Sequence, residues 1–386
     1  MTPHSADSFR SAPEIISKLG PGLPVYCIYP RAYRAAVEEF TRGFPGRTMY
    51  AIKANNAPQV LALLAESGIR DFDCASVDEI RLARESCPDA TCYFMNPVRL
   101  DDAARVAATE FGTRHFVVDH VDAIPRLVAE IDPARSVIFA RMAVHHASAM
   151  EDLSQKFGAA PVEIPPLLDA IAATGAEAAL AFNVGSGVTS PDGYRHAMQV
   201  ARDVLQASKV QVRLLDVGGG FPRSYPGFQV PLLSDYFDVI RDEARSLPLR
   251  DDGELLAEPG RALAAPGLSV IVKVLLKKPD RLYINDGMYG SFWELRFKGH
   301  KRYPFRVYRN GEVLAGETRK YRVFGPTCDS SDVLPEPLEI PADIRVGDYL
   351  EFGAIGAYSV SGRTDFNGFD AGAMFVLDDA DATPPA

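Results

Sequence analysis

Reactive side chains follow several apolar stretches of this sequence. Lys53 ends the apolar run YAIK, and Asp73 lies within FDCAS. A charged lysine is costly to bury, so the ordinary explanation is an ion pair or an amine that reaches solvent. The chemical alternative is a desolvated amine that forms a Schiff base. Other apolar runs end in polar groups at Arg141, Asn183, Ser186, Glu258 and Arg261.

The segment DVGGGF is a candidate anion site. Gly218, Gly219 and Gly220 follow an apolar run, and their N–H groups would face an anion without side chains in the way. The ordinary alternative is a tight turn between a strand and a loop. The spacing matches neither the dinucleotide-binding fingerprint nor the P-loop. Beside such glycines, Arg261 of AEPGR is better explained as a phosphate ligand than as half of an ion pair with Glu258.

Cys328 differs from the other cysteines because it lies among polar residues in GPTCDSSD, where a reactive thiol is plausible. Three others are expected to be small buried apolar groups: Cys74, Cys87 and Cys92. The pair His145-His146 has no second pair of ligands at metal-binding spacing, so no metal site is predicted.

These residues need a scaffold that brings the ends of many strands together. Apolar runs without alternation are typical of parallel strands buried on both faces. Helical patterns separate them, with helices expected at 31–42 and 58–68. Eight such units predict an α/β fold, a (β/α)₈ TIM-like barrel whose site lies at the carboxyl ends of its strands. The expected strands are 47–55, 71–76, 91–96, 115–119, 136–144, 178–186, 212–221 and 254–260.

The pattern changes after Gly267, where strands follow one another without helices. This predicts a C-terminal antiparallel β domain, with an Asn-Gly hairpin at 309–312. Its expected strands are 268–278, 281–286, 305–314, 321–326, 348–353 and 373–379. We predict four parts of the chain. An N-terminal segment, residues 1–29, joins the β domain with a strand at 24–29. The barrel follows at 30–265, then the β domain at 266–378 and a disordered tail at 379–386.

Composition sets limits on the class of protein. The chain has 386 residues, 47% hydrophobic and 24% charged, which is typical of a soluble globular protein. A net charge of -10 argues against a nucleic-acid partner, which needs a basic face. We expect no membrane-spanning segment and no signal peptide. Five cysteines without a C-x-x-C motif favour the reducing cytoplasm.

Taken together, the motifs resemble the fold-type III pyridoxal-phosphate decarboxylases, the ornithine/diaminopimelate/arginine decarboxylase group. The resemblance covers nearly the whole chain and implies a fold of the alanine-racemase/ornithine-decarboxylase type. The Cys-Asp pair in GPTCDSSD favours the ornithine-decarboxylase-like branch, because diaminopimelate enzymes usually carry Cys-Glu. The matching segments are YAIKAN, FDCASVDEI, LSQKFG, FNVGSG, LDVGGGFP, AEPGR, NDGMYGSF, GPTCDSSD and GAYSVS with FNGF.

The resemblance implies pyridoxal 5'-phosphate as cofactor and assigns roles to the residues around it. Lys53 would hold the cofactor covalently, and Glu258 would pair with its pyridine nitrogen so that the ring accepts electrons. Asp73 and Arg141 would brace it. The phosphate ligands would be Ser186, Gly218, Gly219, Gly220, Arg261 and Tyr358.

The resemblance also implies an obligate homodimer. Cys328 and Asp329 would reach into the partner subunit's site, where Cys328 would donate a proton after CO₂ leaves. The implied substrate residues are Tyr289, Arg296, Lys298 and Asp329.

Two positions depart from the family pattern. Asn183 replaces the histidine that stacks on the cofactor ring. Lys298 replaces the acidic residue that binds the distal amine of ornithine, and basic residues surround it: Arg296, His300, Lys301 and Arg302. A basic cluster there would repel a distal ammonium group.

The function predicted from these residues is decarboxylation of an L-amino acid, ornithine or lysine in the leading interpretation, for polyamine synthesis. The basic cluster supports an alternative substrate with a distal anionic or carboxylated group. A third hypothesis is an inactive homologue that binds a partner, as antizyme inhibitors do. Cys328-Asp329 favours a decarboxylase over a racemase of similar fold.

Overall fold

The computed structural model describes residues 9–296 and 302–386. The chain divides into two compact units. One contains Val37–Arg223 and Val230–Ala262, and the other contains the described residues of Met1–Ala36, Ser224–Gln229 and Leu263–Ala386. The short segment Ser224–Gln229 belongs with the second unit, although no pattern in the sequence predicts it. Within the described residues no helix has the length and apolar character needed to cross a membrane.

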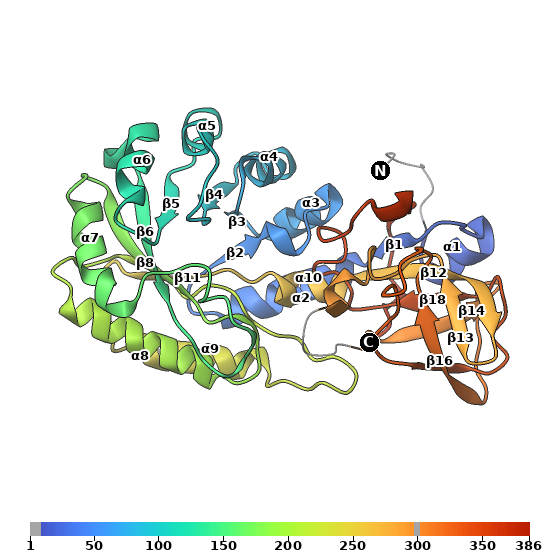
Figure 1. The fold of residues 1–386 in the computed structure, drawn as a ribbon. Helices are drawn as coiled ribbons and strands as arrows, with labels where there is room; N and C mark the ends of the chain where they lie inside the picture. Colours follow the sequence, from blue (N-terminus) through green and yellow to red (C-terminus); the bar gives the residue numbers. More distant parts are fainter. Residues whose placement is uncertain (1–8, 297–301) are drawn as a thin grey trace. The chain divides into compact units, whose positions relative to one another are not determined.

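The first unit is a closed eight-stranded parallel barrel, as predicted, with helices around it (Figure 1). Its strands occur in the order β10-β11-β2-β3-β4-β5-β6-β8. Their interior side chains, such as Met49, Tyr93, Phe139 and Leu256, form one buried cluster. The bounds are β2 Arg47–Ala51, β3 Asp71–Cys74, β4 Thr91–Phe94, β5 His115–Val118, β6 Val137–Ala143, β8 Glu177–Asn183, β10 Leu214–Asp216 and β11 Glu254–Ala257.

Helices alternate with these strands because apolar faces recur at helical spacing and capping residues start the turns. The Ser76 hydroxyl, for example, accepts a hydrogen bond from the Glu79 N–H at the start of α4, and the Glu79 carboxylate accepts one from Ala75 N–H. The helices are α2 Pro30–Gly43, α3 Pro58–Glu66, α4 Val77–Ser86, α5 Ala103–Glu110, α6 Ala123–Glu130, α7 Ile164–Ala172, α8 Asp192–Ala207, α9 Leu233–Ala244 and the short α10 Arg261–Ala264.

The strand predicted at 47–55 is longer than the strand that the structure contains. The run at 47–55 forms β2 only to Ala51, and Ile52–Ala54 form a 3₁₀ turn. The Tyr50 hydroxyl donates to the carbonyl oxygen of Asn55, and the Asn55 side chain accepts a hydrogen bond from Ala57 N–H. These local bonds bend the chain out of the sheet toward α3, which an apolar pattern alone does not show.

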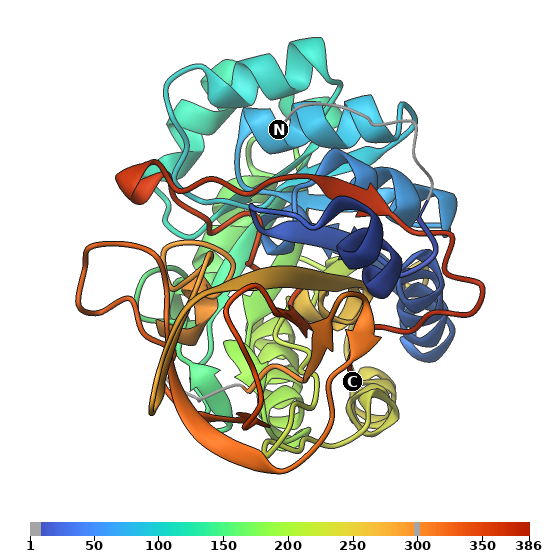
Figure 2. The same cartoon turned by 90° about the vertical axis from the view of Figure 1, so that its right-hand side faces the viewer.

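The second unit contains a nine-stranded sheet whose strands are strongly twisted (Figure 2). The main order is β15-β14-β18-β12-β13-β16-β17, and β1 pairs with β12 and with β19. The strands are β1 Val25–Ile28, β12 Leu268–Lys278, β13 Arg281–Ile284, β14 Phe305–Arg309, β15 Glu312–Val313, β16 Thr318–Phe324, β17 Leu338–Pro341, β18 Tyr349–Phe352 and β19 Met374–Val376.

The sheet confirms the predicted N-terminal strand, since β1 pairs antiparallel to β12. It also confirms the Asn-Gly hairpin, where Asn310 and Gly311 both have positive φ and Arg309 pairs with Glu312. The sheet is only mostly antiparallel, because β1 with β19 and β13 with β16 are parallel pairs. Strand β17 was missed because its run LEIP is short and ends at a proline.

The C-terminal tail makes specific contacts, contrary to the predicted disorder. Asp379 is buried, and its carboxylate accepts a hydrogen bond from Arg31 N–H. The Arg306 guanidinium donates to the carbonyl oxygen of Thr383 at 2.8 Å. The segment after β19 has no helix or strand, which explains why its sequence resembles a disordered tail.

The remaining elements are α1 Ala12–Leu19 in this unit and, in the barrel unit, the two-stranded sheet of β7 Ala149–Glu151 with β9 Ser186–Val188.

Candidate active site

Lys53 lies in the 3₁₀ turn after β2, at the carboxyl end of the barrel strands. Its amine nitrogen is 3.5 Å from an oxygen of Asp73, which is buried at the end of β3. The Lys53 side chain is 50% exposed. The side chain is therefore half exposed beside a carboxylate, and the desolvated amine proposed from the sequence is not what the structure shows.

Glu258 follows β11 and is buried next to Asp216, the last residue of β10. Their carboxyl groups are near enough to shift each other's pKa. Burial raises the pKa of Glu258 well above its usual range, and the nearby Asp216 and Asp73 raise it further, while Lys53 acts in the opposite direction. This end of the barrel thus holds two buried acids whose surroundings favour a proton on the pair.

The three glycines after β10 are required by close packing. A Cβ atom on Gly218 would lie 2.3 Å from the carbonyl oxygen of Phe182, and one on Gly219 would lie 2.7 Å from that of Glu258. Gly218 also has a φ of +71°. Its N–H donates to Asp216 at 2.8 Å, so it is not available to an anion, and the prediction for Gly218 must be corrected. Gly219 and Gly220 remain predicted anion ligands.

Four other predicted residues lie at the same end of the barrel unit. Asn183, at the end of β8, accepts a hydrogen bond from Gly185 N–H at 2.9 Å, and Ser186 begins β9. Arg141 lies on β6 with its guanidinium 5.6 Å from the centre of the Phe157 ring. Arg261 is buried at the start of α10. The barrel therefore gathers an amine, two cations and buried acids, which suits a ligand with a carbonyl and an anionic group.

Tyr358 belongs to the second unit. Its φ is +64°, an unusual backbone conformation for a bulky residue. Such conformations are concentrated at functional sites. The Tyr358 carbonyl oxygen accepts a hydrogen bond from Gly362 N–H at 3.1 Å, which holds the turn.

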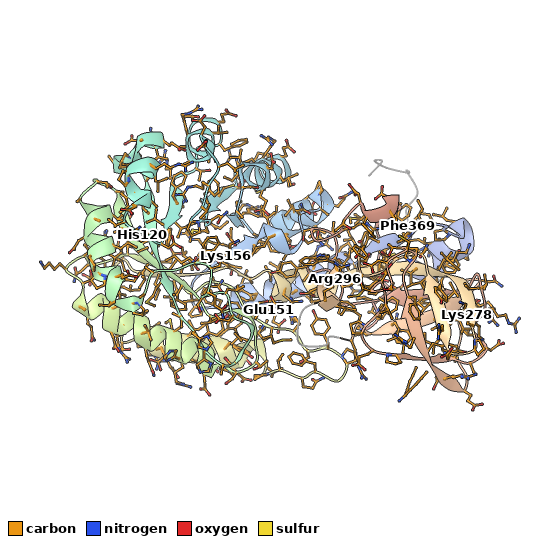
Figure 3. The ribbon with its side chains drawn as sticks, viewed as in Figure 1. His120, Glu151, Lys156, Lys278, Arg296 and Phe369 are labelled. Atoms are coloured by element: carbon orange, nitrogen blue, oxygen red, sulfur yellow. The ribbon has the colours of Figure 1, made fainter. Side chains whose placement is uncertain are left out.

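The predicted substrate residues of the second unit come together, with Lys298 lying outside the described residues. The Tyr289 hydroxyl donates to Asp329, and the Arg296 guanidinium carbon lies 4.1 Å from the centre of the Tyr289 ring (Figure 3, where Arg296 is labelled). Hydrogen bonds from Ser331 N–H and from Tyr289 lower the pKa of Asp329, and Arg296 adds to this effect. Phe366 also stacks on the Tyr289 ring, at 4.3 Å between centroids.

Cys328 is exposed, as predicted for a reactive thiol, whereas the other four cysteines are buried. Its N–H donates to the Asn367 side chain at 3.1 Å. Cys328 and Asp329 line a cavity of about 480 Å³ that also includes the exposed apolar side chains Leu275, Leu276 and Phe369. A thiol, a carboxylate and an apolar surface thus meet at one place on this unit.

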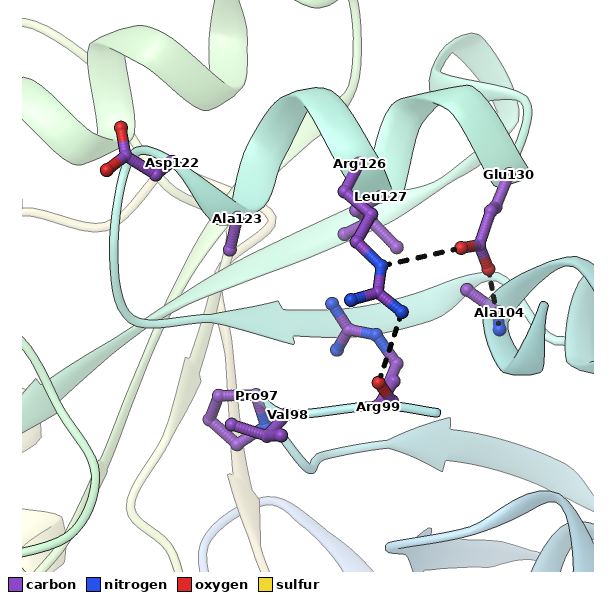
Figure 4. A pocket seen from close by; sticks show the side chains of 9 residues that line it. All are labelled: Pro97, Val98, Arg99, Ala104, Asp122, Ala123, Arg126, Leu127 and Glu130. Atoms are coloured by element: carbon purple, nitrogen blue, oxygen red, sulfur yellow. Dashed lines mark hydrogen bonds and ion pairs between the residues drawn. The ribbon is translucent and has the colours of Figure 1, made fainter. Parts of the chain in front are cut away.

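A second cavity, of about 320 Å³, lies on the barrel unit between the loop 97–99 and helix α6 (Figure 4). Its charged groups already bind protein. Glu130 accepts hydrogen bonds from Ala104 and Arg105 N–H at the start of α5, and Arg99 donates to the carbonyl oxygens of Asn96 and Val117. These contacts join neighbouring loops and helices and suggest no ligand. In the described part of the chain, no cluster of three or more His, Cys, Asp or Glu side chains could hold a metal.

Asp216 and Phe157 are site residues that the sequence reasoning missed. Asp216 directly precedes the three glycines in LDVGGGF, so its position in that motif was the available signal. Phe157 lies in the matched segment LSQKFG, but nothing local indicates that its ring lies over Arg141. Both depend on contacts between strands and loops that are distant in sequence.

Comparison with known proteins gives one consistent result. The family model described as "Pyridoxal-dependent decarboxylase, pyridoxal binding domain" matches residues 30–265. The ornithine decarboxylase of Schizosaccharomyces pombe is 31% identical over 351 residues, covering 85% of this chain and 77% of that protein. Antizyme inhibitor 2 of Xenopus laevis is 30% identical over 354 residues, covering 84% and 74%.

Solved structures agree. An SrLDC mutant in complex with PLP superimposes with a TM-score of 0.85 at 27% identity, covering 96% of each chain. The lysine/ornithine decarboxylase of Vibrio vulnificus, solved with putrescine, has a TM-score of 0.81 at 26% identity, covering 94% of this chain and 96% of that one. The similarity therefore extends over both units of the chain.

Proposed function

This chain belongs to the pyridoxal-dependent decarboxylase family, and on that premise we propose that it decarboxylates an L-amino acid with pyridoxal 5'-phosphate bound in its barrel. The observation that carries the proposal is the grouping at one end of the barrel of the Lys53 amine, the buried Glu258 and the buried Arg261. The products are an amine and CO₂, so the enzyme is a carboxy-lyase.

The residues present fit this cofactor. An accessible amine suits its aldehyde, a buried acid suits its ring nitrogen, and a guanidinium beside small residues suits its phosphate. Gly219 and Gly220 present backbone without side chains, because a Cβ atom at either position would clash with a backbone carbonyl oxygen. Lys53 would hold the aldehyde carbon, Glu258 the nitrogen, and Asp73 and Arg141 would brace the ring. The proposed phosphate ligands are Ser186, Gly219, Gly220, Arg261 and Tyr358.

When bound, the cofactor supplies an electron sink for the bond that breaks. The protein residues position the substrate and transfer the protons. The substrate amine would take the place of the Lys53 amine, and Asp73, with an oxygen 3.5 Å from that amine, would keep it nearby. After loss of CO₂, the Cys328 Sγ would donate a proton to the α-carbon, and the Lys53 amine would take part in product release.

We further propose that the enzyme is a homodimer whose partner subunit completes the site. Cys328 and Asp329 belong to a different compact unit from Lys53. The thiol is exposed beside exposed apolar side chains, a combination that favours burial against another chain. A C₂ interface would supply the thiol reciprocally to both sites.

Two substrate classes follow from the residues. Ornithine or lysine is the substrate implied by the relatives, and Asp329 offers a carboxylate for a distal amine. A second class, with a distal carboxylate, is favoured by the Arg296 guanidinium on Tyr289 and by Lys298 in the sequence. Because Asp329 and Arg296 flank the same tyrosine, a substrate that carries both an amine or hydroxyl and a carboxylate fits best.

The experiment that tests the function is a product screen. The purified holoenzyme is incubated with a panel of cationic and anionic L-amino acids, and amines are identified by mass spectrometry. Formation of one amine with release of CO₂ supports the proposal. No amine from any substrate, together with no bound cofactor, would favour the partner-binding homologue, although Lys53, Glu258, Arg261 and Cys328 are all retained.

We also propose a cytoplasmic location and a role in polyamine or related amine synthesis. All five cysteines are unpaired, which fits a reducing compartment. The polyamine role rests on the relatives, and it depends on which substrate class the screen identifies.

A further inference from the structure

Asp216 and Glu258 are brought together by two neighbouring barrel strands. Asp216 ends β10 in register with Leu256 of β11, and Glu258 lies two residues beyond Leu256. Two backbone hydrogen bonds fix this geometry, from Val217 N–H to the carbonyl oxygen of Leu256 and from Glu258 N–H to that of Gly218, both at 2.9 Å. The pair is therefore built into the barrel, and both side chains are buried.

The buried surroundings of Asp216 favour a proton shared with Glu258. One carboxyl oxygen, Oδ1, accepts from Gly218 N–H at 2.8 Å. No N–H or hydroxyl donor among the described residues reaches the other oxygen, Oδ2, which is buried. The neighbouring carboxyl is that of Glu258, and the two groups shift each other's pKa. Two carboxyl groups can be joined by a hydrogen bond only if one of them carries a proton.

The surroundings keep that proton in place. Burial raises the pKa of Asp216 to about 6 and raises the pKa of Glu258 well above its usual range. Asp73 raises both pKa values further, while Lys53 lowers that of Glu258 and Arg141 lowers that of Asp216. These shifts favour one proton on the pair, which belongs to both groups rather than to either one.

We propose that Asp216 is a positioning residue that takes over the shared proton when the cofactor binds, so that Glu258 faces the ring nitrogen as a carboxylate while its other oxygen accepts a hydrogen bond from Asp216. The proton moves from a Glu258 oxygen to the facing Asp216 oxygen, and no proton enters or leaves the pair. The cofactor arrives with its ring nitrogen protonated. This inference rests on the proposed function, because it assumes that Glu258 faces that nitrogen.

The first test measures cofactor affinity in the cofactor-free protein, by titration with pyridoxal 5'-phosphate. Asp216→Asn keeps an acceptor for Gly218 and places a permanent N–H donor against Glu258, so its dissociation constant should stay within about threefold of wild type. Asp216→Ala removes the donor and should weaken binding by about tenfold or more. Equal, wild-type affinity in both variants, or equal weakening in both, overturns the inference.

The second test needs no cofactor and remains available if Asp216→Ala does not fold. A raised carboxyl pKa in the folded state stabilises the fold below the unfolded pKa of about 4, and this stability is lost as pH rises through the folded pKa. Wild type should therefore lose more stability between pH 5 and pH 8 than Asp216→Asn does, as measured by denaturant unfolding. The exposed Asp251→Asn serves as a control and should follow wild type. Parallel curves for wild type and Asp216→Asn overturn the inference.

The variant Glu258→Gln distinguishes failure of the proposed role of Glu258 from failure of the proposed role of Asp216. If Glu258→Gln binds the cofactor as tightly as wild type, the proposed role of Glu258 fails. If Glu258→Gln binds weakly but Asp216→Ala binds normally, only the role of Asp216 fails.

Discussion

The guanidinium carbon of Arg296 lies 4.1 Å from the centre of the Tyr289 ring, and the hydroxyl of that ring donates a hydrogen bond to Asp329. One aromatic side chain therefore carries a cation on its face and an anion at its edge. Cation–π contacts of this kind stabilise the position of a guanidinium. If this cluster receives the distal end of the substrate, we expect it to favour a distal end that carries both kinds of group over a lone ammonium group.

Substrate preference should change with Lys298→Asp. The substitution replaces a cation with the carboxylate that the family resemblance places there, so kcat/KM for ornithine should rise by tenfold or more and that for an anionic substrate should fall. The measurement is kcat/KM for both substrates. Lys320→Asp, an exposed substitution in the same unit, is the control and should leave the preference unchanged. Efficient use of ornithine by wild type would contradict the prediction.

Lys53→Ala should abolish covalent cofactor attachment and nearly all activity, because Lys53 supplies the amine that holds the aldehyde carbon. Borohydride reduction of wild type, followed by peptide mass spectrometry, should find the cofactor on Lys53. Lys156→Ala is a matched control, since that amine lies 4.9 Å from the ring of Phe157 in the same unit. A reduced adduct on another lysine would show that the assignment is wrong.

Two inactive variants should complement each other if the sites are shared. In a mixture of Lys53→Ala and Cys328→Ala chains, each mixed dimer has one site with both residues. Random pairing should restore roughly a quarter of wild-type activity. Subunit exchange is verified with differently tagged chains. If exchange occurs and activity does not return, each site is built from a single chain.

Gly219→Ala should disturb the barrel end that binds the cofactor. The new Cβ would lie 2.7 Å from the Glu258 carbonyl oxygen, so the backbone of β11 must shift. We expect a loss of about 1–3 kcal/mol in unfolding free energy and weaker cofactor binding. Gly22→Ala, where nothing lies within 4 Å, should be neutral or slightly stabilising. Similar effects of the two substitutions would contradict the close-packing explanation.

Acid should destabilise the barrel through His115, whose ring stacks on Tyr93 at 4.1 Å. Burial, with nearby arginines, lowers the pKa of His115 to about 4. The unfolded chain takes up this proton near pH 6.5, so stability is lost as pH falls from about 6.5 to 4, by about 3 kcal/mol in total. His115→Gln should remove that part of the pH dependence in denaturant unfolding, whereas the exposed His120→Gln should not. If stability changes with pH in His115→Gln as it does in wild type, the proposed role of His115 is wrong.

The sequence by itself determined the order and kind of the elements. Apolar runs separated by helical patterns predicted the eight barrel strands, and the change after Gly267 predicted the β unit, because periodicity and turn chemistry are local properties. The motifs also located Lys53, Glu258, Arg261 and Cys328, since their neighbours in the chain identify them.

Only the tertiary structure decided which of these groups interact. The Asp216–Glu258 pair depends on the register of two strands, and the Arg296–Tyr289 contact depends on how a loop folds back on itself. The parallel pairing of β1 with β19 joins segments from opposite ends of the chain. Such contacts arise from packing between distant residues, and no local pattern encodes them. Lys53 lies in a turn held by a hydrogen bond from Tyr50 to Asn55 rather than in the strand that its apolar neighbours predict, because apolar periodicity does not reveal such a bond.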